Sequence, residues 1–280
     1  MNINDFTIGL RGHDAGKTFD EMLKNCTAHK INALQFAMPK NMPEIDFDEL
    51  GYNADFSEKI YSALSERNIS LPILSCYINP IDTDSEALTR QLNRFKAFLH
   101  YAKDFCAGAV ATETGYVPLD IPDDERKKIY DRFIKSLNYV TDTAKECNVN
   151  IAIEPVATSA VSSPYVMKNV IDDIGLDNIK VVLDMSNLMT QDNFTRQREI
   201  MDTAFALFPD RITAIHLKDF VFENGAKKYA PLGAGMLDAA YLFGKISALS
   251  HFPAIIFDET PLALYEKSLD ALENIISSVK

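Results

Sequence analysis

The sequence predicts an α/β fold, a closed (β/α)₈ TIM barrel formed by residues 1–280 as a single domain. Eight short apolar segments alternate with longer stretches of helical periodicity, which indicates parallel strands covered by helices. Eight such units in 280 residues match the usual size of this barrel, roughly 250 residues. A doubly wound open sheet is the alternative, but the glycine fingerprint expected after its first strand is missing.

The strands are expected where apolar residues run together without clean alternation with polar ones. The eight segments are FTIGLRG (6–12), INALQFAM (31–38), LPILSCYI (71–78), AGAVATE (107–113), NIAIEP (150–155), IKVVLDM (179–185), RITAIHL (211–217) and AIIFDE (254–259). No linker, low-complexity tract or block of like charges divides the sequence, so one domain is the simplest interpretation.

Several of the intervening stretches carry helix signals. Thr18 and Glu21 stand in the register of a capping box. Ser163 suits an N-cap, and Pro164 suits the first turn of the helix that follows. Helices are therefore expected in the stretches 17–26, 85–105, 162–174 and 262–279.

Composition excludes some classes of partner. The net charge of −12 argues against nucleic acid and anionic membranes, because such binding depends on clustered Lys and Arg. The N-terminus lacks a signal-like segment and no long apolar run occurs, so a cytoplasmic protein is expected. The four widely spaced cysteines favour reduced thiols.

Polar residues end the last four predicted strands, where the chemistry of such barrels is found. These residues are Glu154, Asp184, His216 and Glu259. A single residue of this kind at a strand end is more often a cap or a loop contact. Three carboxylates and an imidazole from consecutive βα units, however, would repel one another and resist burial unless a cation lay between them. Three oxygen donors and one nitrogen suit Mn²⁺ or Mg²⁺, with Co²⁺ as a further option. The sequence therefore predicts a divalent-metal site.

Five motifs in order resemble the xylose isomerase-like TIM-barrel proteins, a superfamily of sugar isomerases and epimerases that also includes inosose dehydratase and endonuclease IV. The motifs are IAIEP (151–155), VVLDMSN (181–187), AIHLKDF (214–220), PLGAGMLD (231–238) and FDE (257–259). The resemblance implies that the four residues match the metal ligands of the ketose 3-epimerase branch. It also implies that Glu154 and Glu259 are the acid and base, one on each face of the substrate. The expected function is a metal-dependent sugar isomerase or epimerase that works through an enediolate.

The chain departs from that branch at three substrate contacts. Asn187 replaces a histidine, Ala160 replaces a glutamate and Phe222 replaces an arginine. The substrate of the ketose 3-epimerases is therefore not carried over to this chain.

Other polar residues near strand ends are candidates for substrate binding. For each of them, a purely structural role is the alternative. They are His13, Gln35, Glu113, Asn187 and Lys218. Lys218 should share a side of its strand with His216, two residues earlier. Asp219 is expected either to orient His216 from behind or to cap a loop.

The loop 231–238 lies where many barrels bind phosphate through backbone N–H groups. Alternatively its glycines only turn the chain and Asp238 caps the next helix. Because no cluster of Arg or Lys adjoins it, an unphosphorylated polyol or ketose is favoured as substrate.

Three other functions compete with the isomerase. A dehydratase could use the same enediolate to expel a β-hydroxyl group. A carbohydrate-binding or regulatory barrel without catalysis is another alternative, but the presence of both Glu154 and Glu259 argues against it. An endonuclease of the same superfamily would need a histidine-rich multi-metal site and a basic face, and the sequence offers neither. The apolar residues of YLFGKI (241–246) weakly indicate a homo-oligomer.

Overall fold

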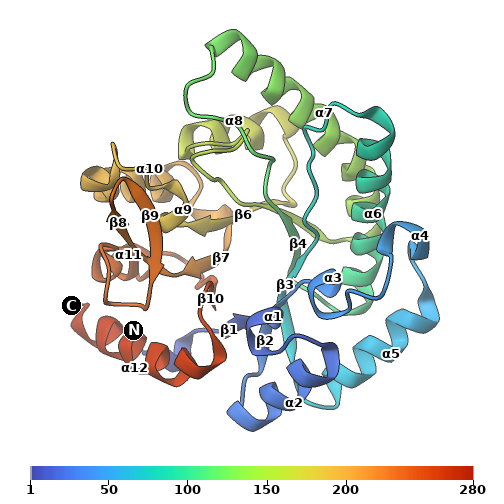
Figure 1. Cartoon of the computed structure of the whole chain (residues 1–280), viewed down its shortest axis with the longest axis horizontal. Helices are drawn as coiled ribbons and strands as arrows, with labels where there is room; N and C mark the ends of the chain where they lie inside the picture. The colour runs from blue at the N-terminus through green and yellow to red at the C-terminus, as the bar shows by residue number, and fades with distance from the viewer. Residues whose placement is uncertain (1, 280) are drawn as a thin grey trace.

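The computed structural model describes residues 2–279 and contains a closed barrel of parallel strands ringed by helices (Figure 1). Neighbouring strands follow the chain order, and the first pairs with the last to close the barrel. All eight predicted strand segments are confirmed, and the open sheet is excluded. The barrel strands are β1 (Ile8–Arg11), β2 (Ala33–Phe36), β3 (Ser70–Ser75), β4 (Ala109–Thr112), β5 (Asn150–Ile153), β6 (Ile179–Asp184), β7 (Ile212–Leu217) and β10 (Ala254–Phe257).

Helices cover the outside of the barrel. The longer ones are α2 (Phe19–His29), α5 (Ala54–Ser65), α6 (Ser85–Asp104), α7 (Asp123–Cys147), α8 (Pro164–Ile174), α10 (Gln197–Leu207), α11 (Ala239–Ile246) and α12 (Tyr265–Ser278). Single turns form α1 (Gly12–Ala15), α3 (Met38–Asn41), α4 (Phe47–Leu50) and α9 (Met185–Leu188). Both predicted N-caps are present, since Thr18 accepts from the Glu21 amide and Ser163 from the Val166 amide. The capping box at Thr18 is incomplete, because the Glu21 carboxylate accepts from the Lys17 amide and not from the Thr18 amide. Within residues 2–279, no helix has the length and apolar character needed to cross a membrane.

The core has two layers because successive strand residues point to opposite sides of the barrel wall. The larger cluster lies between the strands and the surrounding helices. The smaller cluster consists of Ile73, Ala109, Ala111, Ala152, Val182, Ala214, Ala254 and Ile256, all on barrel strands. Short side chains therefore dominate this second layer of the barrel.

One element was not expected from the sequence. After β7 the chain forms an antiparallel hairpin of β8 (Asp219–Glu223) and β9 (Ala226–Ala230), drawn in orange in Figure 1. Asn224 and Gly225 connect the two strands, with φ angles of 51° and 80°. Positive φ at both central residues is typical of the tight type I′ turn that Asn-Gly favours.

Candidate functional site

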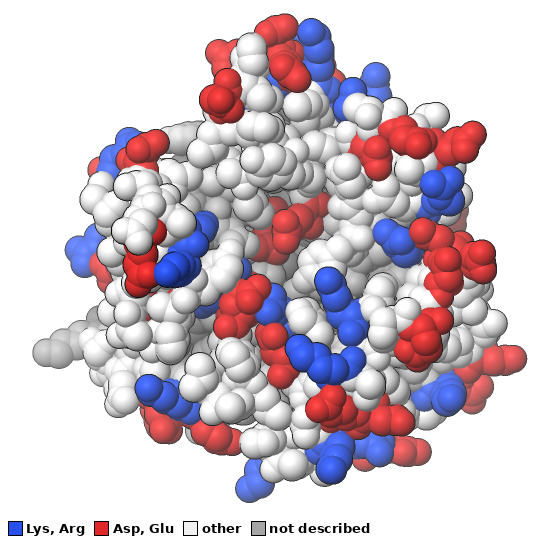
Figure 2. All heavy atoms as spheres, in the orientation of Figure 1, with Lys and Arg blue, Asp and Glu red and all other residues white. Residues whose placement is uncertain are grey.

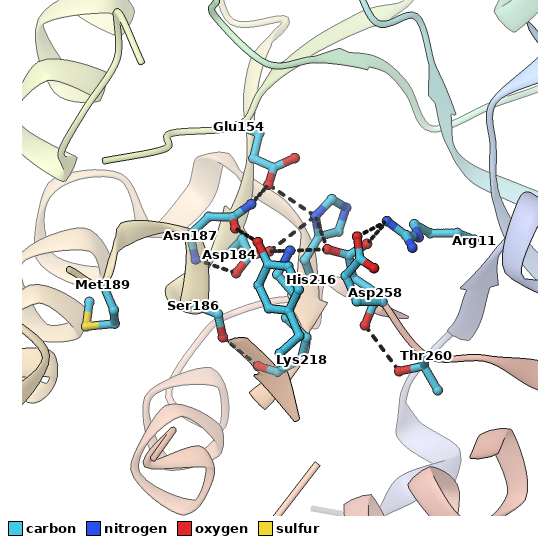
Figure 3. A network of polar contacts seen from close by, with 12 residues as sticks. Arg11, Glu154, Asp184, Ser186, Asn187, Met189, His216, Lys218, Asp258 and Thr260 are labelled. Atoms are coloured by element: carbon cyan, nitrogen blue, oxygen red, sulfur yellow. Dashed lines mark hydrogen bonds and ion pairs between the residues drawn. The ribbon is translucent and has the colours of Figure 1, made fainter. Parts of the chain in front are cut away.

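Three of the four predicted metal ligands converge at the carboxyl ends of the barrel strands. Glu154 follows β5, Asp184 is the last residue of β6, and His216 is the penultimate residue of β7. All three are buried, and one ligand atom from each lies within 4.8 Å of the others. Figure 2 shows a hollow at the centre of this face with acidic side chains inside it, and Figure 3 shows the residues that surround it.

The imidazole of His216 is held from one side. Its Nε2 lies 2.5 Å from Gln35 Oε1, and Gln35 Nε2 in turn donates to the Tyr77 hydroxyl at 3.2 Å. This chain of contacts makes Nε2 the donor in the neutral ring and leaves the Nδ1 lone pair free. Gln35 therefore contacts the ring nitrogen of His216 that faces away from the carboxylates. This orienting role was one of the two roles expected for Asp219.

His216 Nδ1 faces three carboxylates and makes no hydrogen bond to the described residues, although it is buried. It lies 3.4 Å from Glu154 Oε1, 3.7 Å from Asp184 Oδ2 and 4.0 Å from Asp258 Oδ2. Burial opposes the charged imidazolium, but the Glu154 and Asp184 carboxylates raise the pKa of His216 to about 10. The carboxylates thus stabilise a positive charge at this position, which is either a proton on Nδ1 or a cation that takes the place of that proton.

The donor set fits a divalent cation. Asp184 Oδ2 is also buried without a hydrogen bond to the described residues, although the Lys218 ammonium lies 3.1 Å from it, and it faces His216 Nδ1 at 3.7 Å. An imidazole nitrogen with carboxylate oxygens, and no thiolate among them, suits Mn²⁺ or Mg²⁺. Glu154, Asp184 and His216 could therefore hold such an ion.

Glu259 does not join this cluster, contrary to its expected placement. Its side chain is 43% exposed and pairs with Arg11 Nη1 at 3.1 Å. Asp258 is buried and lies in the site instead, because β10 ends at Phe257 and Asp258 is the next residue. The chain then turns through a left-handed conformation at Glu259, with φ of 50°, which directs that side chain elsewhere.

Two cations accompany Asp258. Lys218 Nζ pairs with Asp258 Oδ2 and lies 3.1 Å from Asp184 Oδ2, on the same side of the strand end as His216. Arg11 Nη1 lies 2.7 Å from Asp258 Oδ1. Burial favours the neutral acid, but His216, Lys218 and Arg11 together lower the pKa of Asp258 to about 2. Asp258 is therefore a fixed negative charge.

Asn187 lies against the cluster. Its Nδ2 donates to Glu154 Oε1 at 2.7 Å, and its backbone N–H donates to Asp184 Oδ1 at 2.9 Å (Figure 3). On its other side, Asn187 Oδ1 accepts from the Tyr229 hydroxyl at 3.3 Å. The amide therefore fixes one oxygen of Glu154.

His13 and Glu113 stand apart from these contacts. His13 lies in α1, and its Nδ1 is buried without a hydrogen bond to the described residues. Glu113 follows β4, and the residue as a whole is exposed. Its carboxyl group nevertheless loses hydration and is repelled by Glu154, and both effects raise the pKa of Glu113 above the usual range. No hydrogen bond or ion pair within residues 2–279 links either side chain to the cluster.

Asp219 caps a loop rather than contacting His216. Its carboxylate accepts hydrogen bonds of 2.8 to 3.0 Å from the backbone amides of Phe220, Gly233, Gly235 and Leu237. Loop 231–238 thus directs several of its N–H groups at a carboxylate of the chain itself. Asp238 caps α11, which confirms the prediction that this residue caps the helix after the loop.

Sequence reasoning missed several residues of the site: Arg11, Tyr77, Tyr229 and Asp258. Two of them had a readable signal. The motif FDE offers adjacent carboxylates, and only one of two neighbours at a strand end faces the mouth. The Asn224-Gly225 pair signals the hairpin that carries Tyr229.

Comparison with known families agrees with this arrangement. Residues 23–275 match the family described as Xylose isomerase-like TIM barrel. The chain belongs to this family, as its motifs had indicated. A search of curated proteins found no match.

Many solved structures share the fold. A D-tagatose 3-epimerase-like protein has a TM-score of 0.79 at 12% identity, with 98% of each chain covered. An IOLI protein with a binding zinc atom has a TM-score of 0.74 at 14% identity, covering 98% of this chain and 99% of the other. The probable 3-DHS dehydratase AsbF from Bacillus anthracis has a TM-score of 0.68 at 13% identity, with 98% and 100% covered. At these identities the likeness establishes the fold.

Proposed function

We propose that this chain is a divalent-metal-dependent isomerase or epimerase of a small sugar or polyol. The observation that carries the proposal is the buried, unbonded Nδ1 of His216, which faces carboxylate oxygens from three other strand ends. The similarity in fold to an epimerase-like protein and to a zinc-binding protein supports it.

Glu154, Asp184 and His216 would hold the metal, with Asp258 as the fourth donor in place of Glu259. When bound, a divalent cation would polarise a carbonyl and its neighbouring hydroxyl and stabilise the enediolate formed by loss of a carbon-bound proton. Mn²⁺ and Mg²⁺ suit carboxylate oxygens with one imidazole nitrogen, and Co²⁺ is the next choice.

Glu154 is the proposed base on one side of the substrate. Asn187 engages its Oε1, and Oε2 carries no hydrogen bond to the described residues and points away from the network in Figure 3. Oε2 can therefore take a proton from a substrate carbon. On the opposite side, the Asp258–Lys218 pair is the proposed second proton-transfer position. Burial opposes the charged ammonium, but Asp184 and Asp258 raise the pKa of Lys218 above its usual range, so its ammonium would donate only to a strongly basic carbanion such as the planar intermediate.

The substrate is proposed to be unphosphorylated. The amides of Gly233, Gly235 and Leu237 already donate to the Asp219 carboxylate, so they are not available to a phosphate. A negative charge next to Asp219 would also be repelled.

The test is incubation of the Mn²⁺-loaded protein with a panel of ketoses and polyols in D₂O. Solvent deuterium at a carbon of recovered or isomerised sugar is the expected result, and the Asp184→Asn variant should show none. Absence of both exchange and conversion across the panel, with metal binding intact, would contradict the proposal and favour a barrel that only binds carbohydrate.

A dehydratase is the second candidate. Lys218 pairs with Asp258 within the site, so its ammonium could protonate a departing hydroxyl instead of a carbon. The similarity in fold to a probable 3-DHS dehydratase supports this alternative. In the same D₂O experiment, a product that has lost one water, detected by mass spectrometry, would favour the lyase.

A further inference from the structure

The hairpin of β8 and β9 is fixed to the barrel at two points. At its root, the Asp219 carboxylate binds backbone amides of loop 231–238. Along β9, Lys227 Nζ donates to the carbonyl oxygens of Ser186 and Met189 at 2.7 and 3.1 Å, at the end of α9. These contacts make the hairpin a firmly held wall of the site.

Tyr229 is the hairpin residue that reaches the polar network. Its hydroxyl donates to Asn187 Oδ1 at 3.3 Å, and Lys218 Nζ lies 4.4 Å from the centre of its ring. The residue is 45% exposed, so the ring borders both the buried site and solvent. A tyrosine offers a π-face to the cation and a polar tip to the amide at once.

We propose that Tyr229 is a positioning residue that couples the two sides of the catalytic site. Through Asn187 it holds Glu154, and through the ammonium of Lys218 it holds the pair formed with Asp258. The proton-transfer groups assigned to opposite sides of the substrate are thereby set by one side chain. This inference rests on the proposed function. It assigns a role to Tyr229, which is not one of the proposed metal ligands.

Two variants distinguish the hydrogen bond of the Tyr229 hydroxyl to Asn187 from the contact of its ring with Lys218. Tyr229→Phe deletes the hydroxyl and keeps the ring, whereas Tyr229→Leu deletes both. Tyr165→Phe is the matched control, because Tyr165 is 66% exposed on α8 and bonds to no residue of the site.

Steady-state kinetics at saturating metal should show a graded effect on kcat. Loss of one neutral hydrogen bond predicts a fall of roughly 2- to 10-fold for Tyr229→Phe. Loss of the ring over the ammonium as well predicts a total fall of roughly 10- to 100-fold for Tyr229→Leu. KM and the metal affinity should change much less, and Tyr165→Phe should match the parent. Equal kcat values for the parent and both Tyr229 variants would overturn the inference.

A second measurement does not depend on turnover. The rate at which an amine-acylating reagent modifies Lys218, followed by peptide mass spectrometry, should rise several-fold in Tyr229→Leu and stay unchanged in Tyr229→Phe. An unchanged rate in a folded Tyr229→Leu protein would overturn the inference. If the leucine variant does not fold, Tyr229→Phe kinetics decide. A parent protein without any turnover refutes the proposed function, while Lys218 labelling still tests the placement of Tyr229.

Discussion

The two sides of the barrel mouth carry the same kinds of side chain but balance their charges differently. On the side of β5 to β7, His216 Nδ1 and Asp184 Oδ2 are buried without a hydrogen bond to the described residues. On the side of β10 and β1, Arg11 pairs with both Asp258 and Glu259. The first side shares a single ammonium, Lys218, with Asp258 and leaves His216 Nδ1 without a partner among the described residues, whereas the second side has the guanidinium of Arg11. Counting carboxylates in the sequence does not reveal this difference.

The largest effect is expected from Asp184→Asn, which removes one of the three carboxylate and imidazole groups proposed to hold the metal on the side of β5 to β7. Asn keeps an oxygen for the Asn187 amide, so the start of α9 should survive. A metal supplies several kcal/mol of transition-state stabilisation, so activity should fall by about 10³-fold or more. Calorimetric titration with Mn²⁺ should show metal binding reduced in parallel.

Asp142→Asn is the matched control, because the Asp142 side chain is 86% exposed on α7. It should bind metal and turn over substrate like the parent. If Asp184→Asn bound Mn²⁺ as tightly as this control, the metal site would have to lie elsewhere.

A matched pair on the other side of the mouth distinguishes the two neighbouring carboxylates. Asp258→Asn should lower activity by about 10²-fold, because it removes a buried charge that touches the cluster and Lys218. Glu259→Gln should cost less than about threefold, as expected for an exposed ion pair. Kinetics of both variants at saturating metal provide the test. The reverse order would restore Glu259 as the fourth ligand and the acid or base.

The fold could be predicted because its signals are local. Eight apolar segments of strand length and the caps at Thr18 and Ser163 are each read from a few neighbouring residues. The hairpin was missed although Asn224 and Gly225 signal its turn. Its strands are less apolar than those of the barrel, and β9 is mostly exposed.

The site was predicted only where strand ends are unambiguous. Glu154, Asp184 and His216 end clear apolar segments, and the structure brings them together. At Asp258 and Glu259 a shift of one residue decides which side chain faces the mouth, and the sequence does not set the end of β10 that finely. Contacts such as Arg11 with Asp258 depend on barrel closure, which joins residues 247 positions apart.

An intermediate effect is expected from Gln35→Leu, which releases the imidazole of His216 on the side of β5 to β7. Leucine cannot accept from Nε2, so the imidazole loses the contact that directs Nδ1 at the carboxylates. Loss of such an outer contact should weaken metal affinity or activity by about 10- to 100-fold. Gln91→Leu is the control, since Gln91 bonds to Asn79 and Asp82 instead. Equal metal affinities in the two variants would show that Gln35 does not orient the ligand.

The smallest effect on activity is expected from Gly235→Ala, which acts at the root of the hairpin that continues from β7. A Cβ at this position would lie 2.2 Å from Asp219 Oδ1, so the carboxylate or the loop must move. Such overpacking should lower the free energy of unfolding by about 1–3 kcal/mol. Gly244→Ala is the matched control in α11, where a Cβ meets nothing within 4 Å, and it should gain up to about 1 kcal/mol from helix propensity. Urea unfolding of both variants measures these changes. The proposed metal ligands do not contact Asp219, so Gly235→Ala should retain its affinity for metal even where the hairpin is weakened. A large loss of affinity would mean that the hairpin supports the side of β5 to β7 more directly than its contacts indicate.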